Sequence, residues 1–284
     1  MTNVIACIDD SSLSEYVTDA SVWASIKMEV PLTLLHSLEK AAVTTNKNDL
    51  SGSIGFGSRE HLLGELTELD EKRAKLSLEH GKAILNDAQK HAEAAGAKNI
   101  SLLQRHGDLI ETLTDLEDST RAVILGRCGN NNDMNANTMG SHIERAARAL
   151  HNPILITVGE FKAPTNFMIA YDGRETSDNA IARIIKSPLL KGLTCHLVMA
   201  GEDTKARRAK FENAKALLEQ EGFKVTDALI AGDIYPVLTQ YRQENHIELM
   251  VMGAYAHSKV KQFFVGSNTS KMIVESTIPL LILR

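Results

Sequence analysis

The amino-acid sequence repeats itself at an interval of about 126 residues, and this repeat limits the chain to two copies of one architecture. Four pairs of landmarks share the interval: Gly107 and Gly232, Gly126 and Gly253, Gly140 and Gly266, and Pro153 and Pro279. A length of 284 residues also matches two domains of roughly 150 residues each. We therefore expect one domain at 1–160 and a second at 161–284.

The two halves also open alike, but the first half is longer. The segment VIACIDDSSLS at 4–14 matches FMIAYDGRETS at 167–177, which places Asp9 on Asp172. Between this aspartate and the next landmark glycine, the first half holds about 38 additional residues, and most of them should lie at about 39–75. That stretch contains TTNKNDLSGSIGFGS, which predicts a mobile loop leading into a lengthened helix.

Short apolar runs alternate with amphipathic windows in each half, as in β-α-β units with a parallel sheet. In the second half the expected strands are 166–171, 193–199, 225–230, 248–252 and 279–283, and the expected helices are 177–186, 204–221, 234–246 and 267–276. One helix face should pack on the sheet through Ala206, Ala209, Phe211, Ala214, Leu217 and Leu218. Gly222 and Gly96 are expected to end their helices as C-caps. The fold class is α/β, with two tandem open parallel five-stranded sheets flanked by helices.

Composition restricts the class of protein further. Hydrophobic residues make up 43% and charged residues 24%, which is typical of globular proteins. No window approaches the roughly 18 consecutive apolar residues of a membrane helix, and the start carries two acids rather than the bases of a secretory signal. We expect a cytoplasmic protein without a membrane partner. The three cysteines, Cys7, Cys128 and Cys195, are far apart and predict buried thiols.

The two halves differ in charge. Residues 1–160 hold 15 Lys and Arg against 23 Asp and Glu, whereas residues 161–284 hold 16 against 13. The acidic first half disfavours a nucleic-acid surface, and the second half suits a phosphate ligand better.

The loop at 253–267, GAYAHSKVKQFFVGS, has the features of an anion site. In an open parallel sheet, ligands bind at the carboxyl ends of the strands where the strand order reverses, here between the first and fourth strands of each half. Asp172 ends the first strand, and Gly253 begins this loop. Gly266 and Ser267 open a helix, whose free N–H groups favour an anion, and Lys259 and Lys261 add positive charge.

These features together resemble the universal stress protein family, in which a first strand ending in Asp precedes the pattern Gly, two residues, Gly, nine residues, Gly-Ser or Gly-Thr. Gly253, Gly266 and Ser267 match the pattern, and Ala256 stands at the second glycine. The resemblance covers both halves and implies an adenine nucleotide alpha hydrolase-like, Rossmann-like fold. It implies ATP, with Mg²⁺, as ligand.

The resemblance also assigns roles in the second half. Asp172 would bind the ribose, and the backbone near Val198 at the end of the second strand would meet the adenine. Gly253 and Gly266 would approach the phosphates and Ser267 would bind them, and Ala256 and Asn268 would also contact the cofactor. The first half spaces Gly129 and Gly140 by ten residues, and its loop GNNNDMNANTMG has no lysine or arginine, which predicts a degenerate nucleotide site.

Simpler interpretations stay open for the same residues. Asp172 can order its own turn, and Gly266-Ser267 can be only a helix cap. Adjacent side chains such as Asp9 and Asp10 point in different directions, which disfavours an acid pair or a metal site. The histidines lack metal-ligand spacing, although His36 lies near the expected crevice. No catalytic residue is nominated.

Three functions follow from this sequence. The first is a stress-response module that binds ATP or a related adenine nucleotide in its second half. The alternatives are a scaffold that recognises a protein or another small molecule, and a slow ATPase using His257 or Asp172 with a metal. We also expect an internal pseudo-dimer, because the apolar runs at 153–158 and 279–283 each close a half and should pair at their edges. A homodimer is a further option.

Overall fold

The structure is a computed structural model that describes residues 2–38, 56–127, 141–253 and 267–284. The first half contains, in chain order, β1 (Asn3–Cys7), α1 (Ser14–Met28), β2 (Leu32–Leu38), α2 (Phe56–Ala94), β3 (Ile100–His106), α3 (Leu109–Asp115), the 3-10 helix η1 (Glu117–Ser119), β4 (Thr120–Gly126), α4 (Ser141–Ala149) and β5 (Ile154–Thr157).

The second half repeats this order. It contains β6 (Asn166–Ala170), α5 (Glu175–Lys186), the 3-10 helix η2 (Pro188–Leu190), β7 (Thr194–Ala200), α6 (Lys205–Gln220), β8 (Lys224–Ile230), α7 (Ile234–Glu244), β9 (Met250–Gly253), α8 (Ser267–Glu275) and β10 (Leu280–Leu283). The strands and helices expected here are all present, with ends within two residues of the prediction.

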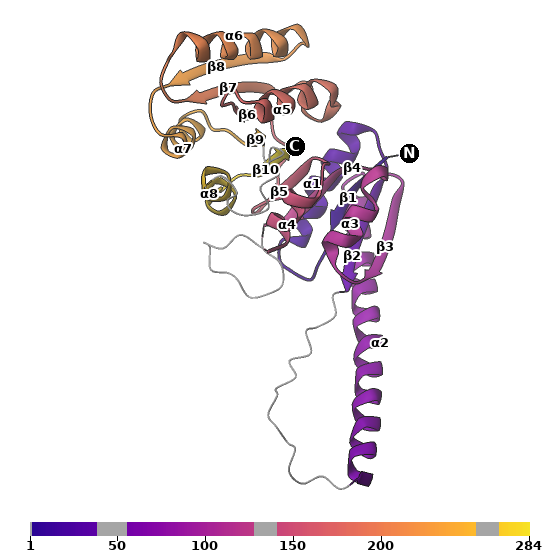
Figure 1. Cartoon of the computed structure of the whole chain (residues 1–284). Coiled ribbons are helices and arrows are strands. Elements are labelled where there is room, and N and C mark those ends of the chain that lie inside the picture. Colours follow the sequence, from indigo (N-terminus) through magenta and orange to yellow (C-terminus); the bar gives the residue numbers. More distant parts are fainter. Residues whose placement is uncertain (1, 39–55, 128–140, 254–266) are drawn as a thin grey trace.

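The strands form one sheet in the order β3-β2-β1-β4-β5-β10-β9-β6-β7-β8 (Figure 1). Pairing is parallel inside each half, whereas β5 and β10 are antiparallel, with Leu155 opposite Leu281. The predicted α/β class is confirmed. The two expected five-stranded sheets are the halves of a single ten-stranded sheet, because the two closing apolar strands hydrogen-bond to each other.

Each face of the sheet carries one hydrophobic layer that crosses both halves. One layer joins side chains of α1, α2, α5 and α6, including Val17, Leu85, Ile184 and Phe211. The other joins side chains of α3, α4, α7 and α8. The ring of Trp23 in α1 lies 5.6 Å, centroid to centroid, from the ring of Phe161, beyond the end of β5. The halves therefore share a continuous core.

The buried face of α6 is narrower than the sequence predicted. Phe211, Ala214 and Leu218 are buried, but Ala206 and Ala209 are exposed and Leu217 is 43% exposed. The reason is that α6 packs on β8, the last strand of the sheet, so only one i, i+3, i+7 line of its surface is covered.

Two glycines end helices as expected. Gly222 has a φ of +84°, its N–H donates to the Glu219 carbonyl, and the next N–H, of Phe223, donates to Leu218. Gly96, with a φ of +94°, ends α2 in the same way. This left-handed closure is one that glycine adopts without a Cβ penalty.

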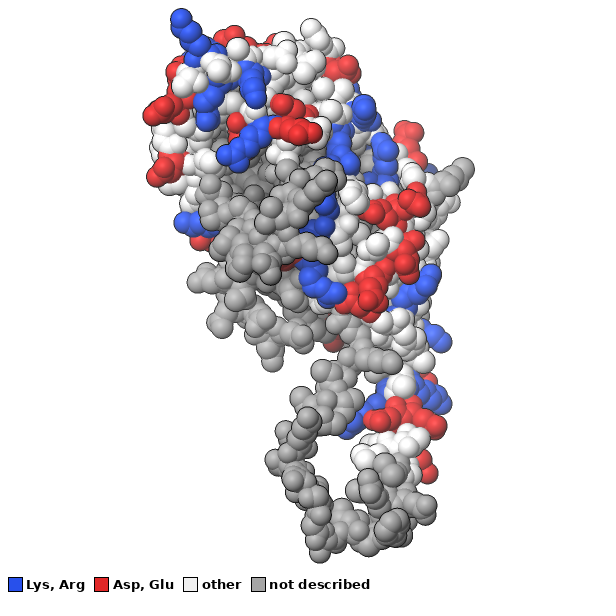
Figure 2. All heavy atoms as spheres, viewed as in Figure 1, with Lys and Arg blue, Asp and Glu red and all other residues white. Residues whose placement is uncertain are grey.

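Helix α2 projects from the body of the molecule as an arm (Figure 1). Every residue from 64 to 77 is exposed, including Leu66, Leu69 and Leu76. The arm carries both acidic and basic side chains, with ion pairs from Lys72 to Glu68 and from Arg73 to Asp70, each 3.9 Å long (Figure 2). The expected lengthened helix is confirmed, while the loop expected at 39–55 lies outside the described residues.

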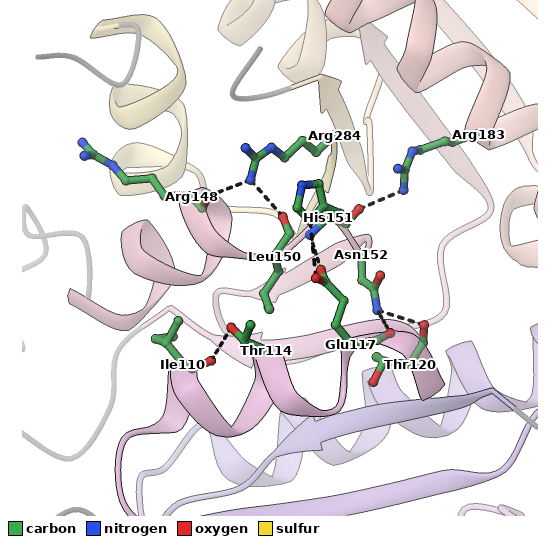
Figure 3. A network of polar contacts seen from close by, with 10 residues as sticks. All are labelled: Ile110, Thr114, Glu117, Thr120, Arg148, Leu150, His151, Asn152, Arg183 and Arg284. Atoms are coloured by element: carbon green, nitrogen blue, oxygen red, sulfur yellow. Dashed lines mark hydrogen bonds and ion pairs between the residues drawn. The ribbon is translucent and has the colours of Figure 1, made fainter. Parts of the chain in front are cut away.

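Arginines tie the two halves together beside the central strands. Arg183 in α5 donates to the carbonyl oxygen of His151, and Arg284 donates to those of Arg148 and Leu150 at the end of α4 (Figure 3). From the other half, Arg127 donates to carbonyl oxygens at the end of α8.

None of the described helices is both long and apolar enough to cross a bilayer.

Candidate functional site

The strand order reverses between β1 and β4 in the first half and between β6 and β9 in the second, as the repeat predicted. In an open parallel sheet such a reversal leaves a crevice at the carboxyl ends of the two strands. Asp172 follows β6, and Gly253 is the last residue of β9, so two of the nominated residues belong to neighbouring strand ends.

Asp172 orders the turn that leads into α5. Its Oδ1 accepts hydrogen bonds from the backbone N–H of Arg174 at 2.9 Å and from the Ser177 hydroxyl at 2.8 Å. The interpretation that Asp172 organises its own turn is therefore confirmed. Among the described residues, Oδ2 has one contact, a long ion pair of 3.7 Å to Nε of Arg174, and the side chain is 42% exposed. One carboxylate oxygen stays available to a ligand.

Gly253 has a packing reason to be glycine. A Cβ at this position would lie 2.6 Å from the carbonyl oxygen of Thr176, in the first turn of α5. Real Cβ atoms do not approach a backbone oxygen this closely, so β9 and α5 can meet only if residue 253 lacks a side chain. Close packing of helix and strand explains this glycine without a phosphate.

Val198 lies inside a strand rather than beyond its end. Strand β7 continues to Ala200, the Val198 side chain is fully buried, and its carbonyl oxygen accepts from the N–H of Tyr171 at 2.9 Å. Strand β7 is paired on both sides and runs two residues beyond Val198. The backbone that leaves the strand is that of Gly201.

Two cations from α6 lie at these strand ends, and sequence reasoning did not nominate them. Lys210 Nζ donates to the carbonyl oxygen of Gly173 at 2.7 Å, and Arg207 Nη2 donates to that of Ala200 at 2.6 Å. Arg207 Nε is buried and has no hydrogen-bond partner among the described residues. The i, i+3 spacing of the pair, directly after the helix cap at Thr204, is the signal that could have revealed them.

The structure does not describe the side chains of the other nominated residues. Ala256 and Gly266 lie outside the described residues, as do Lys259 and Lys261. Ser267 and Asn268 open α8, which begins where the sequence predicted, but their side chains lie outside the described part.

The corresponding place in the first half is organised differently. Asp9 Oδ1 accepts from the backbone N–H and the hydroxyl of Ser11, the same kind of turn as at Asp172. His36 Nδ1 lies 2.7 Å from the Ile8 carbonyl oxygen, and α2 packs on the His36 ring at Gly81, where a Cβ would lie 2.7 Å from Cδ2. His36 is thus a packed residue of the core edge. The Asn-rich loop lies outside the described residues.

Contacts or burial within the protein account for the other acidic and thiol groups that the sequence singled out. Asp10 faces His80, 3.6 Å away, whereas Asp9 turns to Ser11, so the two acids do not form a pair. Burial raises the pKa of Cys195 to about 12, and burial and the charge of Asp9 raise the pKa of Cys7, so both thiols stay protonated at neutral pH. Within the described residues, no group of three His, Cys, Asp or Glu side chains could hold a metal ion.

Sequence comparison finds similar proteins, one of them similar over the whole length of the chain. A model of the universal stress protein family matches residues 197–284. Universal stress protein Slr1230 of Synechocystis sp. is 29% identical over 287 residues, covering 100% of both chains. Universal stress protein MJ0577 of Methanocaldococcus jannaschii is 28% identical over 81 residues, 28% of this chain and 50% of its own length.

Solved structures share the whole two-part fold. A universal stress protein from Archaeoglobus fulgidus superposes with a TM-score of 0.71 at 18% identity, over 99% of this chain and 98% of its own. The functionally unknown protein PA1789 from Pseudomonas aeruginosa superposes with a TM-score of 0.68 at 14% identity, over 100% and 92%. Residues 197–284 thus match the universal stress protein family, and the whole chain is similar in sequence to one universal stress protein and in fold to another.

Proposed function

We propose that the second half binds ATP or a related adenine nucleotide at the carboxyl ends of β6 and β9, and that the bound nucleotide regulates a stress-response module. The observation that carries this proposal is the open carboxylate oxygen of Asp172 beside the strand-order reversal. A carboxylate at the end of a first strand is a suitable acceptor for ribose hydroxyls.

Positive charge around Asp172 supports an anionic ligand. Lys210 and Arg207 bring two cations to the ends of β6 and β7, and Arg207 keeps a buried N–H without a partner among the described residues. The start of α8 at Ser267 adds the positive end of a helix dipole beyond the end of β9. The second half also has the favourable net charge, with 16 basic against 13 acidic residues.

The proposed Mg²⁺ would be held mainly by the phosphates. Mg²⁺ keeps several waters and commonly takes one or two carboxylates together with substrate phosphates. Asp172 Oδ2 is assigned to the ribose in this proposal, so the phosphates and waters would supply the ligands of the Mg²⁺.

The alternative is a scaffold that binds no nucleotide. Gly253 is accounted for by its packing on Thr176, and Asp172 Oδ1 by the turn, so neither residue requires a ligand. The α2 arm offers the scaffold a surface, because Leu66, Leu69 and Leu76 are exposed along it. A slow ATPase would release labelled phosphate from labelled ATP. A protein that only binds ATP would not, so this assay separates the two functions.

Two tests decide between these functions. Mass spectrometry of ligand released from the purified protein should find close to one adenine nucleotide per chain, and its absence favours the scaffold. In titration calorimetry, Asp172→Asn should weaken ATP binding at least about ten-fold while keeping an oxygen for the turn. The matched change in the first half, Asp9→Asn, should leave binding unchanged. Equal losses would contradict a site confined to residues 161–284.

The glycine loops provide a second matched pair. Gly266→Val should abolish binding by adding a branched Cβ at the phosphates, whereas Gly140→Val should have no effect. Bound ATP should also stabilise the native state by about 2.7 kcal/mol at a free concentration 100 times its dissociation constant. A melting temperature that does not respond to millimolar ATP would count against the proposal.

A further inference from the structure

A cavity of about 250 Å³ lies between the two halves, away from the strand ends that carry Asp172. The first half contributes the start of β1, the end of α1, the start of β4 and the turn before β5. The second half contributes the end of α5, η2 and β10. The cavity is smaller than the roughly 300–1,000 Å³ of pockets for drug-sized ligands, so it suits a compact molecule.

Apolar side chains from both halves line much of this cavity. Met28 of α1 meets Leu189 and Leu190 of η2, and Leu281 and Leu283 of β10 complete this side. All five are at most 8% exposed. This part of the lining suits a hydrocarbon tail and has no polar atom to direct a sugar or a base.

The charged residues of the lining are all basic. They are Arg121, Arg183 and Lys186, and no aspartate or glutamate that the structure describes lines the cavity. Arg183 Nη1 donates to the His151 carbonyl oxygen at 2.9 Å, which fixes its guanidinium at the junction of the halves (Figure 3). Within the described part of the chain, the side chains of Arg121 and Lys186 make no hydrogen bond or ion pair.

The uncharged polar groups of the lining are largely used by the protein itself. Asn152 Nδ2 donates to the carbonyl oxygens of Glu117 and Thr120, and the Thr120 hydroxyl donates to that of Leu116. Apart from the Thr2 hydroxyl, the groups left to recognise a ligand are the cations Arg121 and Lys186, with Arg183 beside them, next to an apolar wall. That combination selects a negative charge attached to a hydrocarbon.

We propose that this cavity binds a small amphiphilic monoanion of the medium-chain carboxylate class. The tail packs against Leu189, Leu190 and Leu281, and the carboxylate lies against Arg121 and Lys186. Because both halves line the cavity, the ligand links them beside the β5–β10 pair and stabilises their junction. The site is separate from the proposed nucleotide site and does not depend on it.

Titration calorimetry of the full chain with octanoate tests the proposal. We expect saturable one-to-one binding that tightens about four-fold for each methylene from hexanoate to octanoate. Octanol, which has the tail without the charge, and butyrate, which has the charge with little tail, should each bind at least ten-fold more weakly. No saturable binding of octanoate at millimolar concentration, or equal binding of octanol, overturns the proposal.

Variants locate the binding to this cavity. Arg121→Gln combined with Lys186→Gln should weaken octanoate at least ten-fold and leave octanol unchanged, and both residues are exposed enough for the variant to fold. Lys98→Gln, an exposed lysine elsewhere on the first half, is the control and should bind octanoate as the wild type does. If the double variant also binds normally, the cavity is not the site. Asp172→Asn should leave octanoate binding intact, which separates this result from the nucleotide test.

Discussion

The Nη1 atom of Arg284 lies 2.6 Å from the carbonyl oxygen of Arg148, so the residue after the last strand caps a helix of the first half (Figure 3). A reciprocal contact runs the other way: Arg127 Nη1 lies 3.0 Å from the carbonyl oxygen of Val274 and 2.5 Å from that of Ser276. Cations are favourable at helix C-termini, where carbonyl groups lack intrahelical partners. Each half thus completes a helix end of the other.

Removing one of these caps should lower the free energy of unfolding of the whole protein. Arg127→Ala should lower the free energy of unfolding by about 2 kcal/mol, because it deletes charge-assisted hydrogen bonds to carbonyl oxygens at the junction. Urea unfolding measures the change. Arg105→Ala, an exposed arginine on β3 without a partner among the described residues, is the control and should change it by less than about 0.5 kcal/mol. Similar losses in both variants would show that the junction caps do not stabilise the fold.

The repeat supplies a matched pair of helix caps. Asp108 accepts from the backbone N–H groups of Ile110 and Glu111 at the start of α3, whereas its counterpart Asp233 makes no side-chain cap at the start of α7. Asp108→Ala should therefore cost about 1 kcal/mol of unfolding free energy, and Asp233→Ala clearly less. Chemical unfolding of the two variants checks this. An equal or larger cost at Asp233 would contradict it.

The charge of Asp108 should make its contribution depend on pH. Burial by itself would raise the pKa of Asp108, but hydrogen bonds from Arg145 and the backbone, with the charge of Arg145, hold it below the ordinary value. A carboxyl whose pKa is lowered on folding stabilises the native state above its unfolded pKa of about 3.9, and this stabilisation is lost as the pH falls through the folded pKa. The stability advantage of wild type over Asp108→Asn should thus shrink from pH 7 to pH 3. An advantage that stays constant over this range would refute the ionic origin.

Gly253 should tolerate no side chain. Gly253→Ala places a Cβ 2.6 Å from the Thr176 carbonyl oxygen and should cost about 1–3 kcal/mol of unfolding free energy. Gly64→Ala is the contrasting change, because no atom lies within 4 Å of its Cβ on the exposed arm of α2. There alanine should add roughly 0.5–1 kcal/mol of helix stability. A neutral Gly253→Ala in thermal unfolding would disprove the packing explanation.

The pairing of β5 with β10 predicts how a fragment behaves. A fragment of residues 1–160 exposes the edge of β5, whose four residues are all buried in the full chain. An uncovered apolar edge strand promotes self-association, so sedimentation should show concentration-dependent oligomers. An excess of a peptide spanning residues 276–284 should suppress them by supplying β10. A fragment that stays monomeric without the peptide would contradict the prediction.

Much of this fold could be predicted from the sequence because its signals are local. The apolar runs, the helix windows and the closing glycines Gly96 and Gly222 depend on neighbours within a few residues, and all were found at the expected places. The alternation of strands and helices also predicted that the strand order reverses between the first and fourth strands of each half, and the turn made by Asp172 was one of the interpretations left open.

What only the tertiary structure decided concerns residues far apart in the chain. Periodicity in α6 could not reveal that Leu217 is exposed, because burial depends on how much of the sheet edge the helix covers. Nor could spacing alone show that Arg207 and Lys210 reach the strand ends, or that Gly253 is required by Thr176. The sequence by itself determined two copies of one α/β unit and where their elements begin and end. The pairing of the two closing apolar runs was also expected, and β5 and β10 do pair. The shared cores and the cavity between the halves were decided by packing, which brings together surfaces more than a hundred residues apart.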